Sequence, residues 1–319
     1  MSQSAKGPAT IEKVAELAMK LSRPHLAEYG ATRSRHDFTQ RQLMTCLVLR
    51  AYLKTTYRGV LDVLSASASL RQCLGLGDKL PHFTTLQKFS ARSNVLAIVQ
   101  KLVAVVGQCA AQQKGDSCEV AMDATGLART TVSDYFCSRK GRRFRRWVKV
   151  STVIVCGSLV PIALLIDLNP THDCAHAPEL LGQTRAMAQP KRLFADAGYD
   201  AEWIHVECRE SWGVESVIPA VQRRADGKVG GKWRSKMKPK ALKKAGFGRR
   251  WGVESFFSAL KRTMGSALSA RSPKQMIAEA AFKVGPPRFR KFSSAARYVI
   301  SSKLPEIEFG NERRARHGT

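Results

Sequence analysis

The 319-residue sequence is poor in acidic residues. It contains 25 Asp and Glu against 53 Lys and Arg, which gives a formal net charge of +28 at pH 7. Such an excess opposes compaction through self-repulsion unless a polyanion neutralises it. Nucleic acid is the obvious polyanion, because neutralising phosphates releases counterions and supplies most non-specific affinity. A basic ribosomal or membrane-associated protein is the alternative that charge alone does not exclude.

The sequence also lacks paired cysteines and long apolar runs. None of its eight Cys residues forms a Cys-x-x-Cys pair, which argues against a zinc ribbon or a redox motif. The polar first ten residues contain no apolar signal region. The longest apolar run, 153–166, is interrupted by Gly157 and Pro161 and is too short to span a bilayer. We therefore expect a soluble cytoplasmic protein with no membrane partner.

Residues 11–112 have the apolar periodicity of helices. Thr39 followed by Gln42 makes a capping box, and an apolar face follows it. Several short helices with Lys and Arg on their exposed sides suit a DNA-binding bundle, although a purely structural bundle fits as well. We expect residues 1–112 to form an α-helical N-terminal DNA-binding region.

The pattern changes to strands after a polar linker at 112–116. Gly157-Ser158 separates two apolar, β-branched runs as a hairpin turn would. Strands are predicted at 119–123, 148–155, 159–166, 192–195 and 214–218, and helices at 177–188 and 201–210. Alternation of this kind predicts an α/β domain over 117–284, with helices covering a mixed sheet. Residues 285–319 are basic and lack clear periodicity.

Basic residues dominate the segment 222–249. Between Arg223 and Arg250 there are 12 basic residues, and Asp226 is the only acidic one. A solvated, flexible loop is one interpretation. A phosphate-binding role is favoured because the segment directly precedes the amphipathic helix predicted over 250–264. Its candidate DNA contacts are Lys243, Lys244 and Arg249.

A second basic cluster contains aromatic residues. Its candidate DNA contacts are Arg142, Arg143, Arg145 and Arg146. Phe144 and Trp147 lie among these cations and could stack on bases while the cations follow the phosphates. Because Trp147 opens an apolar strand, we expect its side chain to lie in the core instead.

Two carboxylates follow predicted strands. Asp123 lies in Val-Ala-Met-Asp-Ala-Thr-Gly, and Asp196 lies in Leu-Phe-Ala-Asp-Ala-Gly-Tyr. The chemistry of open α/β sheets sits at the carboxyl ends of strands, where two carboxylates can converge on a hard cation. A single Asp at such a place is more often a turn or cap residue. Asp167 also ends a strand, but nothing around it extends the pattern.

The third carboxylate lies on an amphipathic helix predicted over 250–264. Its apolar face consists of Val253, Phe256, Phe257, Leu260 and Met264. Arg250, Glu254 and Lys261 form a stripe along the edge of that face. A surface pairing of Arg250 with Glu254 explains one contact, but it does not explain why the stripe adjoins the buried face.

Three motifs, taken in order, resemble those of a known family. The spacing Phe247-x2-Arg250-x3-Glu254-x6-Lys261 resembles the Tyr–Arg–Glu–Lys signature of bacterial insertion-sequence DDE transposases, with Phe in place of Tyr. Asp196-x-Gly198-Tyr199 resembles the second-Asp motif of that family, and Met122-Asp123-Ala124-Thr125 resembles the first. The resemblance spans about residues 36–284 and implies an RNase H-like catalytic domain.

The resemblance also implies a mechanism. Asp123, Asp196 and Glu254 would be catalytic and would ligate two Mg²⁺ or Mn²⁺ ions for in-line phosphoryl displacement. Water would attack the transposon end, and the freed 3′-hydroxyl would then attack target DNA. Arg250 and Lys261 would hold phosphates beside the metals. The partner would be double-stranded DNA, namely terminal inverted repeats and target, bound by a homodimer in the bacterial nucleoid.

Other interpretations stay open. His172, Cys174 and His176 offer only three zinc ligands with no fourth nearby, and no nucleophile elbow supports Ser–His–Asp catalysis. An inactive or domesticated copy that only binds DNA is the main rival, and a nuclease that does not transpose is another. Gly285-Pro286-Pro287 stops the last helical pattern, as a frameshifted or degraded copy would.

Overall fold

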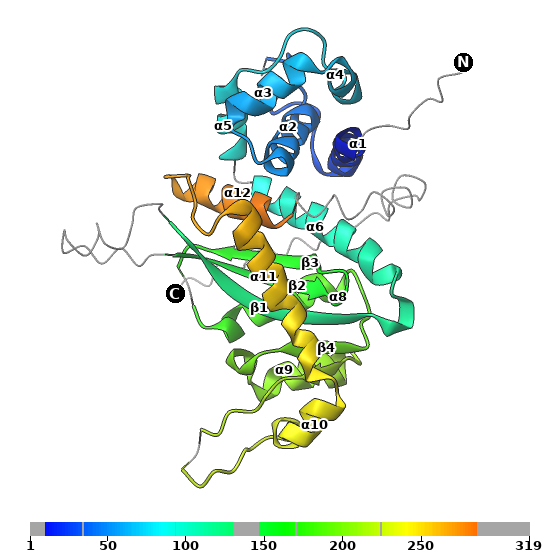
Figure 1. The fold of residues 1–319 in the computed structure, drawn as a ribbon, viewed down its shortest axis with the longest axis vertical. Helices are drawn as coiled ribbons and strands as arrows, with labels where there is room; N and C mark the ends of the chain where they lie inside the picture. The colour runs from blue at the N-terminus through cyan, green and yellow to red at the C-terminus, as the bar shows by residue number, and fades with distance from the viewer. Residues whose placement is uncertain are drawn as a thin grey trace, which may run out of the picture.

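The structure is a computed structural model that describes residues 10–33, 35–92, 94–129, 147–169, 171–223 and 225–285. Figure 1 shows a lobe of helices at one end, a sheet covered by helices in the middle, and α10 at the other end. The expected fold class, a mixed α/β sheet flanked by helices and preceded by an α-helical region, is confirmed.

The N-terminal lobe is built around one buried helix. Its helices are α1 (Thr10–Ser22), η1 (Arg23–His25), α2 (Gln40–Leu53), α3 (Tyr57–Ala66), α4 (Ala68–Leu74) and α5 (Phe83–Ser90). In α2 every residue from Leu43 to Leu49 is buried, as expected of a helix that is apolar on all sides. The predicted capping box is confirmed: Thr39 Oγ1 accepts from the Gln42 amide, and the Gln42 side chain accepts from the Thr39 amide.

Helix α6 (Val95–Gln112) joins the lobe to the sheet and packs mainly against β3. Gly107 allows this close approach, because a Cβ atom there would lie 2.4 Å from the Cα atom of Ile162. Among the described residues, α6 alone is long and apolar enough to cross a membrane, and 67% of it is buried inside the protein. A core helix explains that composition. The expected domain limits, 1–112 and 117–284, stay a prediction.

The central sheet has the order β3-β2-β1-β4-β5. Its strands are β1 (Glu119–Ala128), β2 (Trp147–Val155), β3 (Val160–Asp167), β4 (Arg192–Ala195) and β5 (Glu215–Val217). Strands β1, β2 and β3 are antiparallel, whereas β4 and β5 run parallel to β1. The sheet is therefore mixed, as predicted from the sequence.

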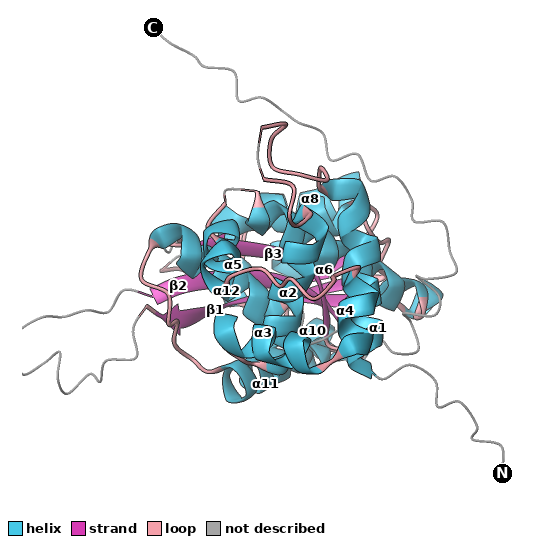
Figure 2. Ribbon diagram, turned by 90° about the horizontal axis from the view of Figure 1, so that it is seen from above, coloured by secondary structure: helices cyan, strands magenta, loops and turns pink. Residues whose placement is uncertain are grey.

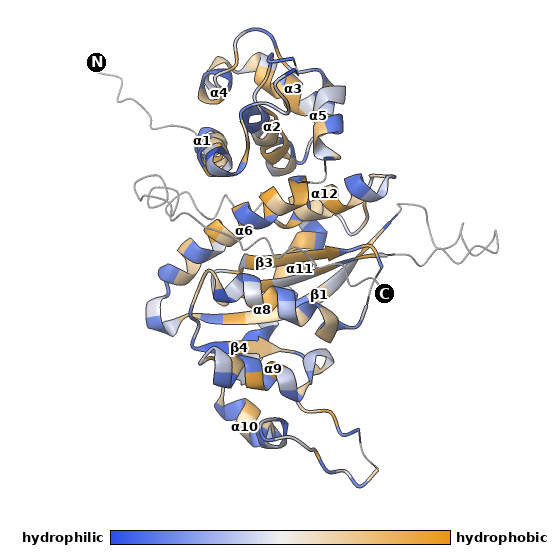
Figure 3. Ribbon diagram, turned by 180° about the vertical axis from the view of Figure 1, so that it is seen from behind, coloured by the Kyte–Doolittle hydropathy of each residue, from blue (hydrophilic) through white to orange (hydrophobic). Residues whose placement is uncertain are grey.

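Helices cover both faces of the sheet. They include α8 (Ala177–Arg185), α9 (Glu202–Val206) with a following π-helical turn (Glu207–Ser211), α11 (Trp251–Met264) and α12 (Pro273–Val284). Figure 1 shows α11 in front of the sheet and α8 behind it, and Figure 3, seen from behind, shows the reverse. The view from above in Figure 2 also places these two helices on opposite sides of the strands. Strand β3 is mostly apolar in Figure 3, as burial between two helical layers requires.

Two predictions about individual segments need correction. The basic segment 222–249 is not simply a loop, because it contains α10 (Pro239–Lys244) and 3₁₀ turns at Arg234–Lys236 and Phe247–Arg250. The Trp147 side chain is not in the core, because Trp147 is 45% exposed. It opens β2 opposite Ala128, which is itself exposed at the end of β1.

Candidate active site

Asp123 and Asp196 lie side by side because of the strand register. Met122 of β1 pairs with Ala195 of β4 in the parallel part of the sheet, and each Asp is the next residue in the sequence. Asp123 Oδ1 accepts a hydrogen bond of 2.7 Å from the Ala124 amide. Asp196 Oδ1 accepts one of 2.9 Å from the Gly198 amide and caps the 3₁₀ turn Ala197–Tyr199. Backbone amides therefore orient both carboxylates.

The surroundings of these two carboxylates disfavour their ionised forms. Burial raises the pKa of Asp123 to about 6, and the neighbouring negative charge of Asp196 adds to that rise, while the Ala124 amide and Arg250 oppose it. Burial also raises the pKa of Asp196. A bound cation would relieve the repulsion between two such groups, and oxygen donors suit a hard divalent ion.

Helix α11 brings Glu254 to the same edge of the sheet. Val253, Phe256 and Leu260 are buried, and the helix contacts β1, so its register is fixed by packing. Arg250, just before the helix, has its Nη1 atom 3.6 Å from Asp123 Oδ2. Its Nη2 atom donates to Glu254 Oε1. One guanidinium thus joins the first and third predicted carboxylates.

The three carboxylates are suitable ligands for a hard divalent cation. Asp123 and Asp196 lie side by side and are the best placed of the three to share one. The Glu254 carboxylate forms an ion pair with the Arg250 guanidinium, and the Glu254 side chain is 44% exposed. Within the described ranges, no three His, Cys, Asp or Glu side chains are already gathered as a metal cage. A shared site for all three carboxylates therefore requires Arg250 to release Glu254.

A fourth carboxylate, Asp173, lies at this site, and sequence reasoning missed it. Asp173 belongs to the turn Asp173–His176 and sits 2.8 Å from the Nζ atom of Lys149, whose side chain is only 7% exposed. Its negative charge raises the pKa of both Asp123 and Asp196. No strand ends at Asp173, and the nearby His and Cys residues drew attention to zinc instead.

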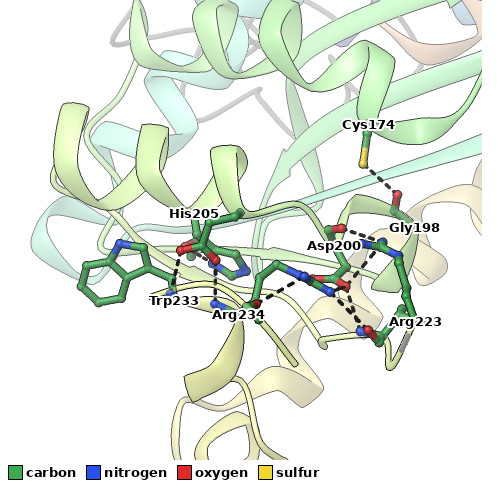
Figure 4. Close-up of polar contacts among 11 residues, drawn as sticks. Cys174, Gly198, Asp200, His205, Arg223, Trp233 and Arg234 are labelled. Carbon is green, nitrogen blue, oxygen red and sulfur yellow. Dashed lines mark hydrogen bonds and ion pairs between the residues drawn. The ribbon is translucent and has the colours of Figure 1, made fainter. Parts of the chain in front are cut away.

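The residues considered for zinc have other roles. Cys174 Sγ donates to the Gly198 carbonyl at 3.1 Å (Figure 4), which ties its turn to the loop that carries Asp196. His176 is buried between Ser151 Oγ at 2.7 Å and Asp167 Oδ2 at 3.2 Å. Asp167 also accepts from the Asn169 amide at 2.7 Å, as a turn carboxylate does.

The basic segment is anchored four residues after Asp196. Asp200 is fully buried and accepts from Arg234 Nε at 2.6 Å, Arg234 Nη2 at 2.7 Å and the Val221 amide at 2.8 Å (Figure 4). Burial alone would raise the pKa of Asp200, but the Arg234 hydrogen bonds bring it below its ordinary value. Glu202 accepts from the amides of Trp233 and Arg234. These contacts hold the basic segment against α9 and the turn that precedes it.

The predicted DNA contacts lie in different surroundings. Lys243 and Lys244 are exposed on α10, and Lys261 is half-buried on α11. Arg249 contacts the buried carboxylate of Glu119, so part of its role is structural. The predicted contacts Arg142, Arg143, Arg145 and Arg146 lie outside the described residues.

Comparison with known proteins finds similarities to a protein family and to solved structures. A family model described as a transposase DDE domain matches residues 114–283, which is more than half of the chain. The cryo-EM structure of a piggyBac transposase synaptic complex with hairpin DNA is similar with 12% sequence identity and a TM-score of 0.44. The match covers 93% of this chain and 74% of that one. A search of curated proteins finds no match.

Proposed function

The chain belongs to the transposase DDE domain family, and we propose that it cuts DNA at transposon ends and joins those ends to target DNA in a metal-dependent reaction. The observation that carries the proposal is the pairing of Met122 with Ala195, which sets Asp123 beside Asp196. Arg250 then connects Asp123 to Glu254 on α11. These contacts support a site at one edge of the sheet, which Glu254 would join once Arg250 releases it.

We propose that Asp123, Asp196 and Glu254 hold two Mg²⁺ or Mn²⁺ ions. When bound, such ions activate the attacking oxygen and stabilise the leaving oxygen of an in-line displacement. The Ala124 and Gly198 amides keep one oxygen of each Asp oriented, which leaves the other free for a ligand.

Arg250 has a second role in the proposal. Its guanidinium pairs with both Asp123 and Glu254. A guanidinium carries five donors and binds phosphate in a bidentate manner. When DNA and metal enter, Arg250 exchanges Glu254 for a phosphate, and Glu254 becomes free to join the metal site. Lys261, further along α11, binds a neighbouring phosphate.

We propose that the basic residues bind double-stranded DNA, both terminal inverted repeats and target. The basic segment brings Lys243, Lys244 and Arg249 to the duplex, and the basic cluster at 142–146 adds Arg142, Arg143, Arg145 and Arg146. The helices of region 1–112 bind DNA, residues 117–284 catalyse, and residues 285–319 form a basic tail. The chain acts as a homodimer on DNA, in the cytoplasm of a bacterium and associated with its nucleoid.

Cleavage of an oligonucleotide that carries the terminal repeat, in Mg²⁺, tests this function. We expect the wild-type chain to nick the repeat end and to join the new 3′-hydroxyl to a target duplex. Asp123→Ala, Asp196→Ala and Glu254→Ala should each abolish both steps. Asp167→Asn should cut normally, because the Asp167 carboxylate contacts His176 and the Asn169 amide. DNA binding without cleavage would support an inactive DNA-binding copy instead, and nicking without joining would support a nuclease.

A further inference from the structure

A hollow of about 740 Å³ lies between α8 and α9, which Figure 3 shows from the side of the sheet opposite α11. Its lining is mainly apolar and includes Leu181 of α8, Val206 of α9 and the buried ring of Trp212. None of the described residues proposed to bind DNA or metal lines it. The hollow is therefore separate from the proposed active site.

The charges at this hollow differ from those of the chain as a whole. The chain has a formal net charge of +28, whereas the charged residues lining the hollow are two carboxylates, Glu202 and Glu207, and one cation, Arg185. A nucleic acid gains little from such a lining, because it binds through its phosphates. An exposed apolar surface with a few charges of both signs at its rim is typical of a contact with another protein.

A projecting side chain and an open space lie next to each other at the hollow. Trp203 of α9 lines it and is 44% exposed. Gly182 of α8 also lines it, and a Cβ atom at Gly182 would have no described atom within 4 Å. Glycine inside a helix is unfavourable relative to alanine. No contact within the described chain requires glycine at this position, but the approach of a large side chain from outside would.

The rim carries one ion pair that is open to solvent. Arg185 Nη1 lies 3.2 Å from Glu207 Oε1, and the two side chains are 49% and 43% exposed. Exposed pairs of this kind contribute little to stability. Arg185 and Glu207 can therefore exchange partners at low cost when a surface with the same two charges approaches.

We propose that this face binds the same face of a second copy of the chain across a two-fold axis. Trp203 of each copy lies over the partner's Gly182, and Arg185 of each copy pairs with the partner's Glu207. A two-fold contact is self-complementary, so one face must carry both halves of every contact. The face between α8 and α9 meets that condition for shape and for charge. The inference rests on the proposed function, because it gives the proposed homodimer its contact surface.

Sedimentation equilibrium of the full chain without DNA tests the inference. At about 0.15 M salt the Debye length is about 8 Å, which weakens the repulsion between two cationic copies. We expect the wild-type chain to form dimers. Trp203→Ala should weaken dimerisation by about 30-fold, as the loss of an aromatic anchor does. Trp251→Ala is the matched control, since Trp251 is 68% exposed on α11 and does not line the hollow, and it should dimerise as the wild type does.

Gly182→Leu separates dimerisation from folding. The leucine side chain fills the space that the partner's Trp203 needs, so dimerisation should weaken at least as much as in Trp203→Ala. The helical signal in circular dichroism should not fall, because leucine favours a helix more than glycine does.

Two charge reversals test whether the ion pairs form between the copies. Arg185→Glu and Glu207→Arg each place like charges opposite one another in the dimer, and each should weaken dimerisation by about tenfold or more. An equimolar mixture of the two variants should form mixed dimers, because both pairs between the copies then join opposite charges.

The inference is overturned if the wild-type chain is a monomer, or if either Trp203→Ala or Gly182→Leu dimerises as the wild type does. It is also overturned if Trp251→Ala loses as much, or if the mixture of charge variants forms no more dimer than each variant alone. A chain that dimerises as expected but never cuts DNA contradicts the proposed cleavage alone. A chain that cuts and joins DNA but fails these tests contradicts the contact surface alone.

Discussion

The ion pair between Asp200 and Arg234 allows a sharp test of how the basic segment is held. Arg234→Met removes two charge-assisted hydrogen bonds, of 2.6 and 2.7 Å, from a fully buried carboxylate. Breaking a buried pair by removing one partner costs about 3–5 kcal/mol, because it leaves an uncompensated charge. The Val221 amide at 2.8 Å and Arg223 at 3.5 Å remain. We therefore expect the unfolding free energy to fall by about 3 kcal/mol, at the lower end of that range.

Urea unfolding measures this loss, and Lys240→Met is the charge-matched control. Lys240 is exposed on α10, so its replacement should change stability by less than about 0.5 kcal/mol. Trypsin should cleave the segment 222–249 faster in Arg234→Met than in the control. Asp200→Asn combined with Arg234→Met should be more stable than the sum of the single variants, by about 2 kcal/mol.

The stabilisation from the Asp200–Arg234 pair should depend on pH in a defined direction. The pKa of Asp200 is lower in the folded chain than its ordinary value. The pair with Arg234 therefore stabilises the fold fully at pH values above the ordinary pKa of a carboxyl group. That stabilisation is lost as the pH falls through the folded pKa, and the wild type and Arg234→Met should then converge. Equal stability and equal trypsin sensitivity of Arg234→Met and Lys240→Met near neutral pH would refute the proposed anchoring.

Four further variants test contacts seen in the structure. Gly107→Ala should destabilise the chain by about 3 kcal/mol in urea unfolding, because its Cβ atom meets the β3 backbone. Gly182→Ala, with open space around it on α8, should be neutral or stabilising by up to about 1 kcal/mol. Asp173→Asn should cost about 3 kcal/mol, because it leaves buried Lys149 without its carboxylate, and equal stability would contradict that role. Asp123→Asn should unfold at higher urea than the wild type at pH 7 in EDTA, by about 3 kcal/mol, because the folded pKa is raised to about 6. That advantage should disappear as the pH falls from about 6 to below 4, since protonated Asp123 no longer destabilises the fold; an advantage that is independent of pH would contradict this reasoning.

Local sequence patterns were sufficient to place the strands that carry the first two carboxylates. The apolar stretches before Asp123 and Asp196 end at these residues, as predicted. The prediction that the first strand ends at Asp123 was wrong, because β1 continues to Ala128; what stops at Met122 is the pairing of β1 with β4. The helix that carries Glu254 was predictable for a similar reason, because its apolar face has a 3.6-residue period.

Contacts between residues distant in sequence were not predictable in the same way. Asp173 reaches the site because the turn after β3 folds back onto Lys149, and no periodicity encodes that fold. Arg234 appeared as one cation among many in a basic segment, although its partner Asp200 is buried. The prediction that the Trp147 side chain lies in the core was wrong, because an apolar strand pattern does not show which part of the strand the helices leave uncovered.

Metal binding at the three carboxylates is the central claim, and titration calorimetry with Mn²⁺ tests it most directly. The wild-type chain bound to duplex DNA should take up Mn²⁺, while Asp123→Asn, Asp196→Asn and Glu254→Gln should each weaken that uptake strongly. Asp167→Asn should bind as the wild type does, because Asp167 lies with His176 and not at this site. Unchanged Mn²⁺ binding in Glu254→Gln would contradict a site shared by all three residues, and unchanged binding in all three variants would contradict the account as a whole.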